Sequence, residues 1–428
     1  MPKYSYFLIA LILMLVPLYP KFPLLGISGT FVSVRLEDFV LAAIFLFWLV
    51  SRIKSLRELA HLPTHRAILL YLGVGVTALF SGIFLTKTAS TSLGLLHWIR
   101  RVEYMAVFFV AFDFLKSRAQ LFFLTRTLIL VSLLVGLYGL GQQFLGLPVI
   151  STTNTEFAKG LALSLGPGAR INPTFAGHYD LAAYSVFPLL LILGLLILPG
   201  TKFKFLLIAN GLVIYWSLLL SASRVTFAAF FLTAGLFILV MRKYFWLAPL
   251  AVIAVISILV TPQLLGRYRE FVINHLITGV PSAHAQAVDE ETADALKPPS
   301  VPEDRSLNIR LKAEWPRALR SFWKNPVFGT GFSSVGLATD NDYLRSLAET
   351  GALGFAALGL IILRFLKSSF RYLISPPQTF ESVFIASITF GLVGLLLNAV
   401  FIDVFEASKV AIVTWTLLGL AEKTKTLI

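Results

Sequence analysis

Residues 187–198 read FPLLLILGLLIL, within a longer apolar segment at about 178–198. Two other stretches, LAAIFLFWLV at 41–50 and FLTAGLFILV at 231–240, are equally apolar. A helix rises about 1.5 Å per residue, so about 20 such residues cross about 30 Å of hydrocarbon. These segments therefore predict membrane-spanning helices, because the helices of a soluble core are usually shorter.

The composition of the whole chain agrees with this prediction. Of the 428 residues, 57% are hydrophobic and 14% are charged, whereas soluble domains carry about a quarter charged residues. A soluble fold could not bury so much apolar surface. Only helices and closed barrels satisfy their backbone groups in lipid, and the long apolar runs favour an all-α integral membrane protein.

We predict about twelve transmembrane helices from the repeated apolar runs. Their approximate bounds are 4–19, 38–53, 66–85, 102–116, 121–144, 178–198, 203–220, 225–241, 244–261, 350–366, 380–401 and 404–421. The predicted organisation is helices 1–9 in residues 1–261, a large external loop at 262–349, and helices 10–12 in residues 350–428. The first apolar segment lacks a clear small-residue cleavage site and is interpreted as an uncleaved helix.

Basic residues predict the orientation of these helices. The Lys and Arg residues of the short connections fall on one side, among them Arg52, Lys116, Lys202 and Arg242, and such an excess marks the cytoplasmic side. Both termini are then cytoplasmic, while two long connections, at 146–177 and 262–349, are external. Because the Lys and Arg residues behind the net charge of +14 lie mainly in the short connections between spans, this charge does not indicate a nucleic-acid partner.

The second external loop contains SLNIRLKAEWPRALRSFW at residues 306–323. Leu311, Trp315 and Leu319 recur there at helical spacing, which predicts an amphipathic helix on the membrane surface. Pro316 would kink a helix interior, so two short helices are the alternative.

Four external arginines are candidates for binding a phosphate-bearing substrate: Arg170, Arg224, Arg310 and Arg317. Guanidinium groups bind phosphate oxygens bidentately and remain charged at every accessible pH. Together, three of them could hold one pyrophosphate. Each taken singly is equally consistent with a surface charge, or with an arginine that reaches the lipid headgroups.

Carboxylates on the same side could accept a proton from an attacking hydroxyl. The candidates are Asp340, Asp342, Glu349 and Glu314. Turn formation by Asp340 and helix capping by Glu349 are the alternative roles. The GTG at 329–331 could bind phosphate through backbone amides, although an ordinary glycine turn is the favoured interpretation.

No metal site or other cofactor is predicted. The chain has no cysteine, and the external histidines lack metal-ligand spacing. Charges inside predicted spans, Glu103, Asp113, Glu406 and Lys409, are costly in lipid and would also suit a proton-coupled transporter. Glu406 and Lys409, three residues apart, are expected to pair. No internal repeat supports the transporter interpretation.

Four segments resemble the O-antigen ligase and O-antigen polymerase family in their order along the chain. They are VRLEDFVLA at 34–42, RINPTFAGHYDLAAY at 170–184, SASRVTF at 221–227 and NPVFGTGFSSVGLATDNDYLRSLAETGALGF at 325–355. The resemblance extends over essentially the whole chain, and the last segment is the most specific. It implies a bacterial cytoplasmic (inner) membrane enzyme that assembles envelope polysaccharide with its active site on the external face.

The resemblance also implies a reaction and a set of site residues. A glycan would pass from undecaprenyl pyrophosphate to an acceptor hydroxyl without a metal, with Arg224 and Arg310 on the pyrophosphate and Arg170 as a third choice. Ligases of the family characteristically offer a histidine where this chain has Asp340. This difference favours a polymerase over a ligase that transfers glycan to lipid A core, with a transporter or flippase as a second alternative.

We therefore expect Asp340 to accept the hydroxyl proton while the arginines stabilise the departing pyrophosphate. Asn341, Asp342, Tyr343, Glu314 and Glu349 are expected to support this site.

Overall fold

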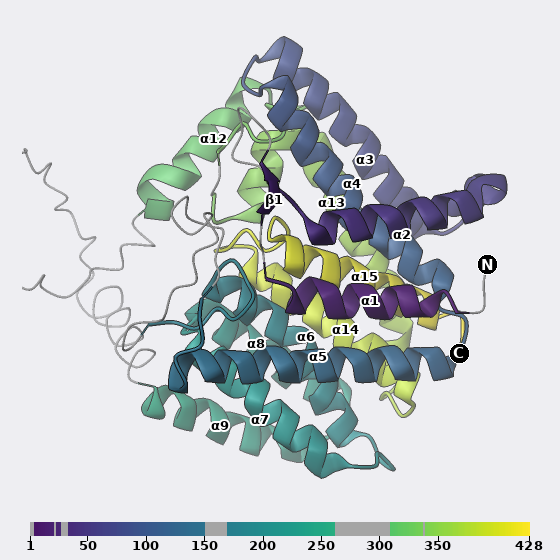
Figure 1. Ribbon diagram of the computed structural model, residues 1–428, viewed down its shortest axis with the longest axis vertical. Helices are drawn as coiled ribbons and strands as arrows, with labels where there is room; N and C mark the ends of the chain where they lie inside the picture. The colour runs from purple at the N-terminus through teal and green to yellow at the C-terminus, as the bar shows by residue number, and fades with distance from the viewer. Residues whose placement is uncertain (1–3, 21–22, 27–32, 150–168, 262–308, 337–338) are drawn as a thin grey trace, which may run out of the picture.

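The computed structural model describes residues 4–20, 23–26, 33–149, 169–261, 309–336 and 339–428 as a bundle of helices (Figure 1). The α-helices are α1 Tyr6–Leu18, α2 Leu36–Arg52, α3 Pro63–Phe80, α4 Thr91–Phe114, α5 Arg118–Phe144, α6 His178–Ile197, α7 Lys204–Leu220, α8 Arg224–Val240, α9 Leu247–Val260, α12 Trp315–Lys324, α13 Asp342–Ile374, α14 Phe380–Asn398 and α15 Ser408–Thr424. Two short antiparallel strands, β1 Pro23–Gly26 and β2 Ser33–Arg35, form the sheet of the described chain. This architecture confirms the all-α membrane fold class.

Each of the twelve predicted spans falls on a helix, but six segments of the described chain are long and apolar enough to cross a membrane. They are Leu36–Leu56, Pro63–Leu85, Arg118–Phe144, His178–Ile197, Asp342–Ile374 and Phe380–Asn398. Helices α1, α7, α8 and α9 are shorter than a full span, and α4 contains Arg100, Arg101, Glu103 and Asp113. The count of about twelve spans therefore stays a prediction.

The sequence predicts two external loops, at 146–177 and 262–349. Residues 150–168 of the first and 262–308 of the second lie outside the described residues. The part that is described confirms the amphipathic helix. A π-helical turn, Arg310–Glu314, leads directly into α12. Pro316 lies in the first turn of α12, where a missing amide leaves no hydrogen bond unmade.

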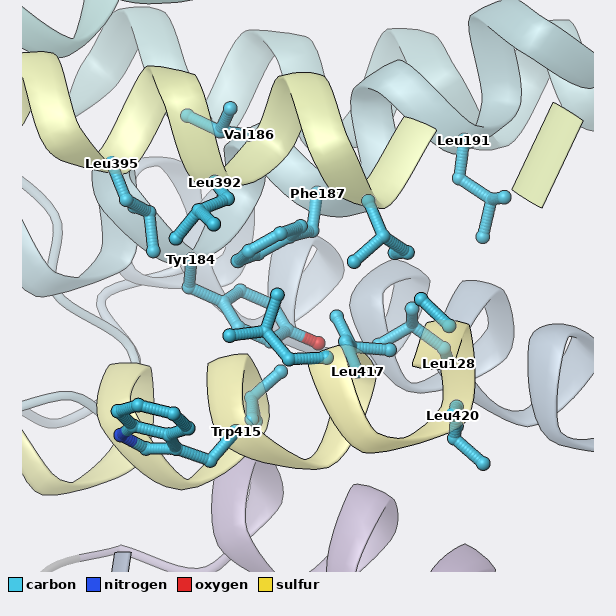
Figure 2. Packing of buried hydrophobic residues seen from close by; sticks show 14 of the residues in the cluster. Leu128, Tyr184, Val186, Phe187, Leu191, Leu392, Leu395, Trp415, Leu417 and Leu420 are labelled. Atoms are coloured by element: carbon cyan, nitrogen blue, oxygen red, sulfur yellow. The ribbon is translucent and has the colours of Figure 1, made fainter. Parts of the chain in front are cut away.

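The core forms where α6, α14 and α15 pack together in the middle of the bundle (Figure 2). Tyr184 and Phe187 of α6 are almost fully buried. A Cβ at Gly391 of α14 would lie 2.3 Å from the Phe187 ring, so glycine permits this close approach. Inside the core, the Tyr184 and Ser132 hydroxyls lie 2.9 Å apart, which satisfies both polar groups where water is excluded.

Helix α13 is broken at Gly351, whose φ is +66°. The segment 325–331 packs into the break. The amides of Thr330 and Gly331 donate to the carbonyls of Ala348 and Glu349, each at 2.9 Å, and the Ala352 amide donates to the Pro326 carbonyl at 2.8 Å. The break thus satisfies its own backbone groups. The GTG amides are used here, which favours the turn interpretation over phosphate binding.

We expect Gly329→Ala to destabilise this region strongly. Gly329 has a φ of +78°, and a Cβ would lie 2.4 Å from the Glu349 carbonyl oxygen, so both conformation and packing oppose a side chain. Thermal unfolding of the purified protein should shift to a lower temperature. Gly235→Ala, in α8 with no atom within 4 Å of the new Cβ, is the matched control and should cost nothing. Equal unfolding temperatures for the two variants would contradict the prediction.

Candidate functional site

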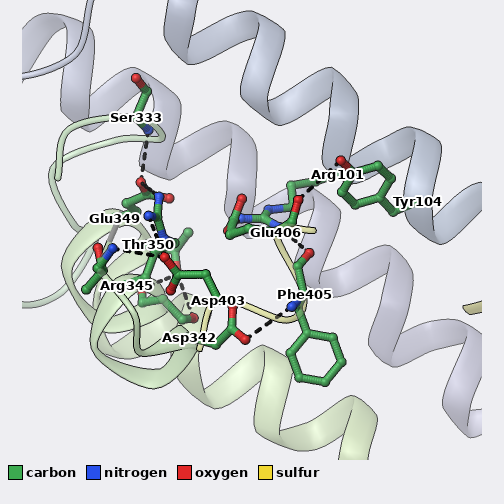
Figure 3. Close-up of polar contacts among 12 residues, drawn as sticks. Arg101, Tyr104, Ser333, Asp342, Arg345, Glu349, Thr350, Asp403, Phe405 and Glu406 are labelled. Carbon is green, nitrogen blue, oxygen red and sulfur yellow. Dashed lines mark hydrogen bonds and ion pairs between the residues drawn. The ribbon is translucent and has the colours of Figure 1, made fainter. Parts of the chain in front are cut away.

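The candidate site lies where the start of α13, the Arg310–Lys324 helical segment and the loop between α14 and α15 meet. Figure 3 shows the contacts between the start of α13 and that loop, among them those of Asp342, Arg345 and Asp403. The loop 399–407 is joined to the start of α13 by the Asp342 amide, which donates to the Ala399 carbonyl at 2.9 Å. Residues far apart in the sequence are thereby brought together at one end of α13.

Asp403 organises the backbone of this site. Its carboxylate accepts hydrogen bonds from the amides of Thr339, Asp340 and Asn341, at 2.9, 3.1 and 3.0 Å. It also forms an ion pair of 2.9 Å with Arg345. Burial by itself would raise the pKa of the Asp403 carboxyl, but Arg345 and the amides outweigh burial and hold the pKa below its usual value. Asp403 is therefore a fixed anion that shapes the 339–341 turn.

Arg345 connects this anion to Glu349. The two side chains are almost fully buried, and their charged groups lie 3.4 Å apart, one helical turn along α13. Glu349 also accepts from the Ser333 amide at 3.1 Å. With these bonds made, Glu349 serves to pack the 325–336 loop against α13, and it is poorly placed to accept a proton from a substrate.

Arg310 and Asp340, two of the predicted site residues, form an ion pair. The Arg310 Nη2 and Nε atoms lie 2.7 and 2.9 Å from Asp340 Oδ2. The guanidinium is buried, whereas about a third of the Asp340 side chain, 32%, is exposed. Asp340 has a φ of +49°, a conformation that non-glycine residues seldom adopt. Asp403 holds it there through the Asp340 amide.

If Asp340 is the base of the transfer reaction expected from the sequence, its surroundings predict how that reaction depends on pH. Burial raises the pKa of the Asp340 carboxyl above its usual value, and the Arg310 guanidinium opposes that rise. A base must be ionised to accept a proton. As the pH is lowered, the transfer rate should therefore begin to fall at a higher pH than it would for an ordinary aspartate, whose pKa is about 4. The measurement is kcat/KM against pH. The residual transfer by Asp340→Asn should be independent of pH across that range. If this variant shows the same fall in kcat/KM at low pH as the unaltered protein, Asp340 is not the base.

Asn341, Asp342 and Tyr343 contribute to the structure of the site. The Asn341 side chain caps α13 by accepting from the Leu344 amide at 2.9 Å. Asp342 accepts from the Phe405 amide at 3.1 Å, and the Tyr343 hydroxyl donates to the Leu396 carbonyl at 2.7 Å. Asp342 and Tyr343 therefore fasten α13 to its neighbours, whereas the Asn341 side chain caps α13 itself. Their supporting role in the reaction stays a prediction.

Glu314 and Arg317 lie on the amphipathic segment beside the ion pair. Burial and, next, the Asp340 carboxylate raise the pKa of the Glu314 carboxyl. One Glu314 oxygen, Oε2, is buried without a hydrogen-bond partner among the described residues. Arg317 packs by Gly336, where a Cβ would lie 3.9 Å from the guanidinium carbon. Glu314 is thus a second carboxylate close to Asp340.

Arg170 reaches the same region from the segment before α6. Its Nη1 atom lies 2.7 Å from Nε2 of His178. The next residue is Tyr179, and the Arg310 guanidinium carbon lies over its ring, 6.0 Å from the ring centre. Since an arginine can only donate, His178 accepts at Nε2. That nitrogen is therefore occupied in this arrangement.

Buried Lys409 holds this segment in place. It donates to the carbonyls of Tyr19 and Thr174, at 2.6 and 2.7 Å. Glu406 forms an ion pair with Arg101 of α4 and lies in the loop before α15. The expected pairing of Glu406 with Lys409 is replaced by these separate contacts, because the chain from 399 to 407 is a loop and does not have helical spacing.

Arg224 is the first residue of α8. Two residues on, the Thr226 hydroxyl donates to the Asn398 side chain at the end of α14, at 2.5 Å. Because Ala399, the next residue, binds the Asp342 amide, the start of α8 lies at the same end of the bundle as the start of α13. Arg224 and the Arg310–Asp340 pair are thus on one side of the molecule.

A cavity of about 30 Å³ lies beside the buried ion pairs. Its lining includes Arg101, Arg345 and Glu349 together with apolar side chains such as Phe332 and Trp415. It has room for a water molecule but not for a sugar. A glycan would have to meet the site at the exposed edge of Asp340.

Sequence reasoning missed Asp403 and Arg345. Arg345 had a local signal, since it stands four residues before Glu349, the spacing at which opposite charges pair on a helix, but both residues fall in the predicted external loop. Asp403 had only a weak signal. It is an acidic residue in the short connection between the last two predicted spans, on the predicted external side.

Comparison with known protein families finds a match in this part of the chain. The O-antigen ligase family model matches residues 205–359, a segment that includes Arg224, Arg310 and Asp340 but neither Arg170 nor Asp403. A search of curated proteins finds no significant match.

Proposed function

The match supports membership of the O-antigen ligase and polymerase family, and from it we propose that this enzyme transfers a glycan from undecaprenyl pyrophosphate to an acceptor hydroxyl. The apolar helices fit a multi-pass membrane protein, and the family match supports a role in envelope polysaccharide assembly. The donor, the acceptor and the external position of the site belong to the proposal.

The observation that carries the proposal is the Arg310–Asp340 pair at 2.7 Å. A partly exposed carboxylate beside a buried guanidinium offers a proton acceptor and an anion-binding group in one place. Asp342 and Glu349 are engaged by backbone amides, so Asp340 is the better base. Glu314 is the next candidate.

The proposed step forms a bond between the acceptor oxygen and the anomeric carbon while the bond from that carbon to the pyrophosphate breaks. Asp340 takes the proton of the acceptor hydroxyl. Arg224 and Arg310, with Arg170 and Arg317 nearby in support, neutralise the pyrophosphate that leaves with the bonding electrons. Attack opposite the leaving group inverts the anomeric carbon, and no metal is required.

The favoured form of this activity is polymerisation, in which the acceptor is itself a glycan chain. The argument for it is Asp340 at the position where ligases of the family offer a histidine. Ligation to lipid A core or another acceptor is the second candidate, because His178 lies beside Arg170, 2.7 Å away, and could act as a base if that contact opened.

The test is to incubate purified protein with envelope lipid extract that contains undecaprenyl pyrophosphate glycans and to follow glycan length and attachment on gels. A lengthening ladder that is lost in Arg224→Ala and Asp340→Asn would support the polymerase. A shift of glycan to another acceptor, lost in His178→Ala, would favour the ligase. If no lipid donor is consumed, the transferase proposal fails and transport becomes the better explanation.

The proposed orientation in the cytoplasmic membrane predicts where cysteines can be labelled. The chain has no cysteine, so single substitutions are specific probes. In intact spheroplasts, a membrane-impermeant maleimide should label Lys324→Cys on α12 but not Ile428→Cys at the C-terminus. After lysis both should react. The reverse pattern would place the site on the cytoplasmic side.

A further inference from the structure

An apolar groove lies between α2 and α4, away from the Arg310–Asp340 pair. Its volume is about 380 Å³, in the usual range for ligand pockets. Its lining is mostly aliphatic and aromatic, with Phe39, Ala42 and Phe45 from α2 and Ile99, Ala106 and Val110 from α4. Phe39 and Ile99 are about half exposed, so the groove opens at the surface of the bundle. In a membrane, such a groove accepts a hydrocarbon chain.

Charged residues of both signs gather at this groove. Asp38, Arg100 and Glu103 are part of its lining. The Arg100 guanidinium lies 3.3 Å from Asp38, whose carboxylate also accepts from the Arg35 amide at 2.9 Å. Glu103 has no hydrogen bond or ion pair with the residues that the structure describes, although Asp38 and Arg100 lie close enough to interact with it electrostatically. A partly buried carboxylate in this position favours a cationic ligand group.

We propose that the groove binds one phospholipid with a zwitterionic, ammonium-bearing headgroup of the phosphoethanolamine type. The acyl chain occupies the groove, Arg100 binds the phosphate, and Glu103 binds the ammonium. An anionic headgroup fits less well, because Glu103 and Asp38 oppose it while Arg100 already shares its charge with Asp38.

The groove is separate from the proposed transfer site, although one helix serves both. Arg100 lines the groove, whereas the next residue, Arg101, lines the cavity of about 30 Å³ beside Arg345 and pairs with Glu406. The proposal therefore does not rest on the transferase assignment, and a bound lipid would fix the part of α4 from which Arg101 reaches the 399–407 loop.

The experiment is native mass spectrometry of the purified, detergent-solubilised protein titrated with dioctanoyl phosphatidylethanolamine or dioctanoyl phosphatidylglycerol. One phosphatidylethanolamine should bind at least about tenfold more tightly than phosphatidylglycerol, as expected for one charge-assisted contact. Ala42→Phe, which fills the groove, should abolish this binding. Ala43→Phe, one residue along α2 and outside the lining, is the matched control and should bind as the unaltered protein does.

Glu103→Gln tests the headgroup without changing the apolar groove. It should remove the preference for phosphatidylethanolamine while leaving some binding of both lipids. Equal affinity for the two lipids in the unaltered protein, or equal binding by the Ala42→Phe and Ala43→Phe variants, would overturn the proposal. Should Ala42→Phe fail to fold, the headgroup preference and its loss in Glu103→Gln still decide the matter.

Discussion

Arg310→Ala should lower glycan transfer by about a hundredfold or more, the usual effect of removing one group that stabilises developing negative charge. The loss should appear in kcat more than in KM, because the charge on the leaving pyrophosphate develops during bond cleavage. Arg310→Lys should recover little, since lysine lacks the planar pair of donors that reach Asp340 at 2.9 and 2.7 Å.

Arg320→Ala is the matched control for this experiment. Arg320 stands on the same helical segment, ten residues along, but is exposed. Its removal changes the net charge equally and should leave transfer within about twofold, as is usual for surface substitutions. If Arg320→Ala loses as much transfer as Arg310→Ala, the effect comes from general surface charge and not from a specific site.

Asp403→Asn should reduce both stability and transfer. Asparagine removes one of the two acids that pair with buried Arg345, and Glu349 remains as its partner. The cost should therefore lie below the about 3–5 kcal/mol of a buried charge left without any partner. The asparagine side chain keeps one acceptor oxygen, so the amides of Thr339, Asp340 and Asn341, which bind both carboxylate oxygens, could not all keep their hydrogen bonds. The left-handed conformation of Asp340 would then be held less firmly. Thermal unfolding measures the first effect, and transfer at a temperature where the variant remains folded measures the second.

A double substitution separates the ion pair from the turn. The double variant Arg345→Met with Asp403→Asn should unfold at a higher temperature than the sum of the two single losses predicts, because the attraction between these two side chains is lost in each single variant and can be lost only once. Buried Glu349 lacks its Arg345 partner in the double variant and in Arg345→Met alike, so that cost is the same in both. Transfer should remain low in the double variant, since the 339–341 turn still lacks one of its two acceptor oxygens. Glu58→Gln, which breaks an exposed pair with Arg52, is the control and should cost about 0–1 kcal/mol. Strict additivity in the cycle would show that Asp403 and Arg345 do not act as a pair.

The candidate site was predicted from the sequence only in part. Arg310 and Asp340 were named separately and proved to be in contact, because the sequence carries the chemical type of each residue but not its partner. Asp342 and Glu349 were named as possible bases, and the structure shows their carboxylates engaged by backbone amides. Which of several acids remains accessible depends on the backbone that surrounds each of them.

The sequence by itself determined that this chain is an all-α membrane protein with an amphipathic segment before α13. Runs of apolar residues and helical periodicity are local properties, and lipid leaves the backbone few alternatives. Tertiary structure alone decided that Asp403 anchors the 339–341 turn and pairs with Arg345, 58 residues earlier. It also decided that the 325–331 segment fills the break at Gly351. Such contacts depend on how separate helices pack, and packing brings together residues that no local pattern relates.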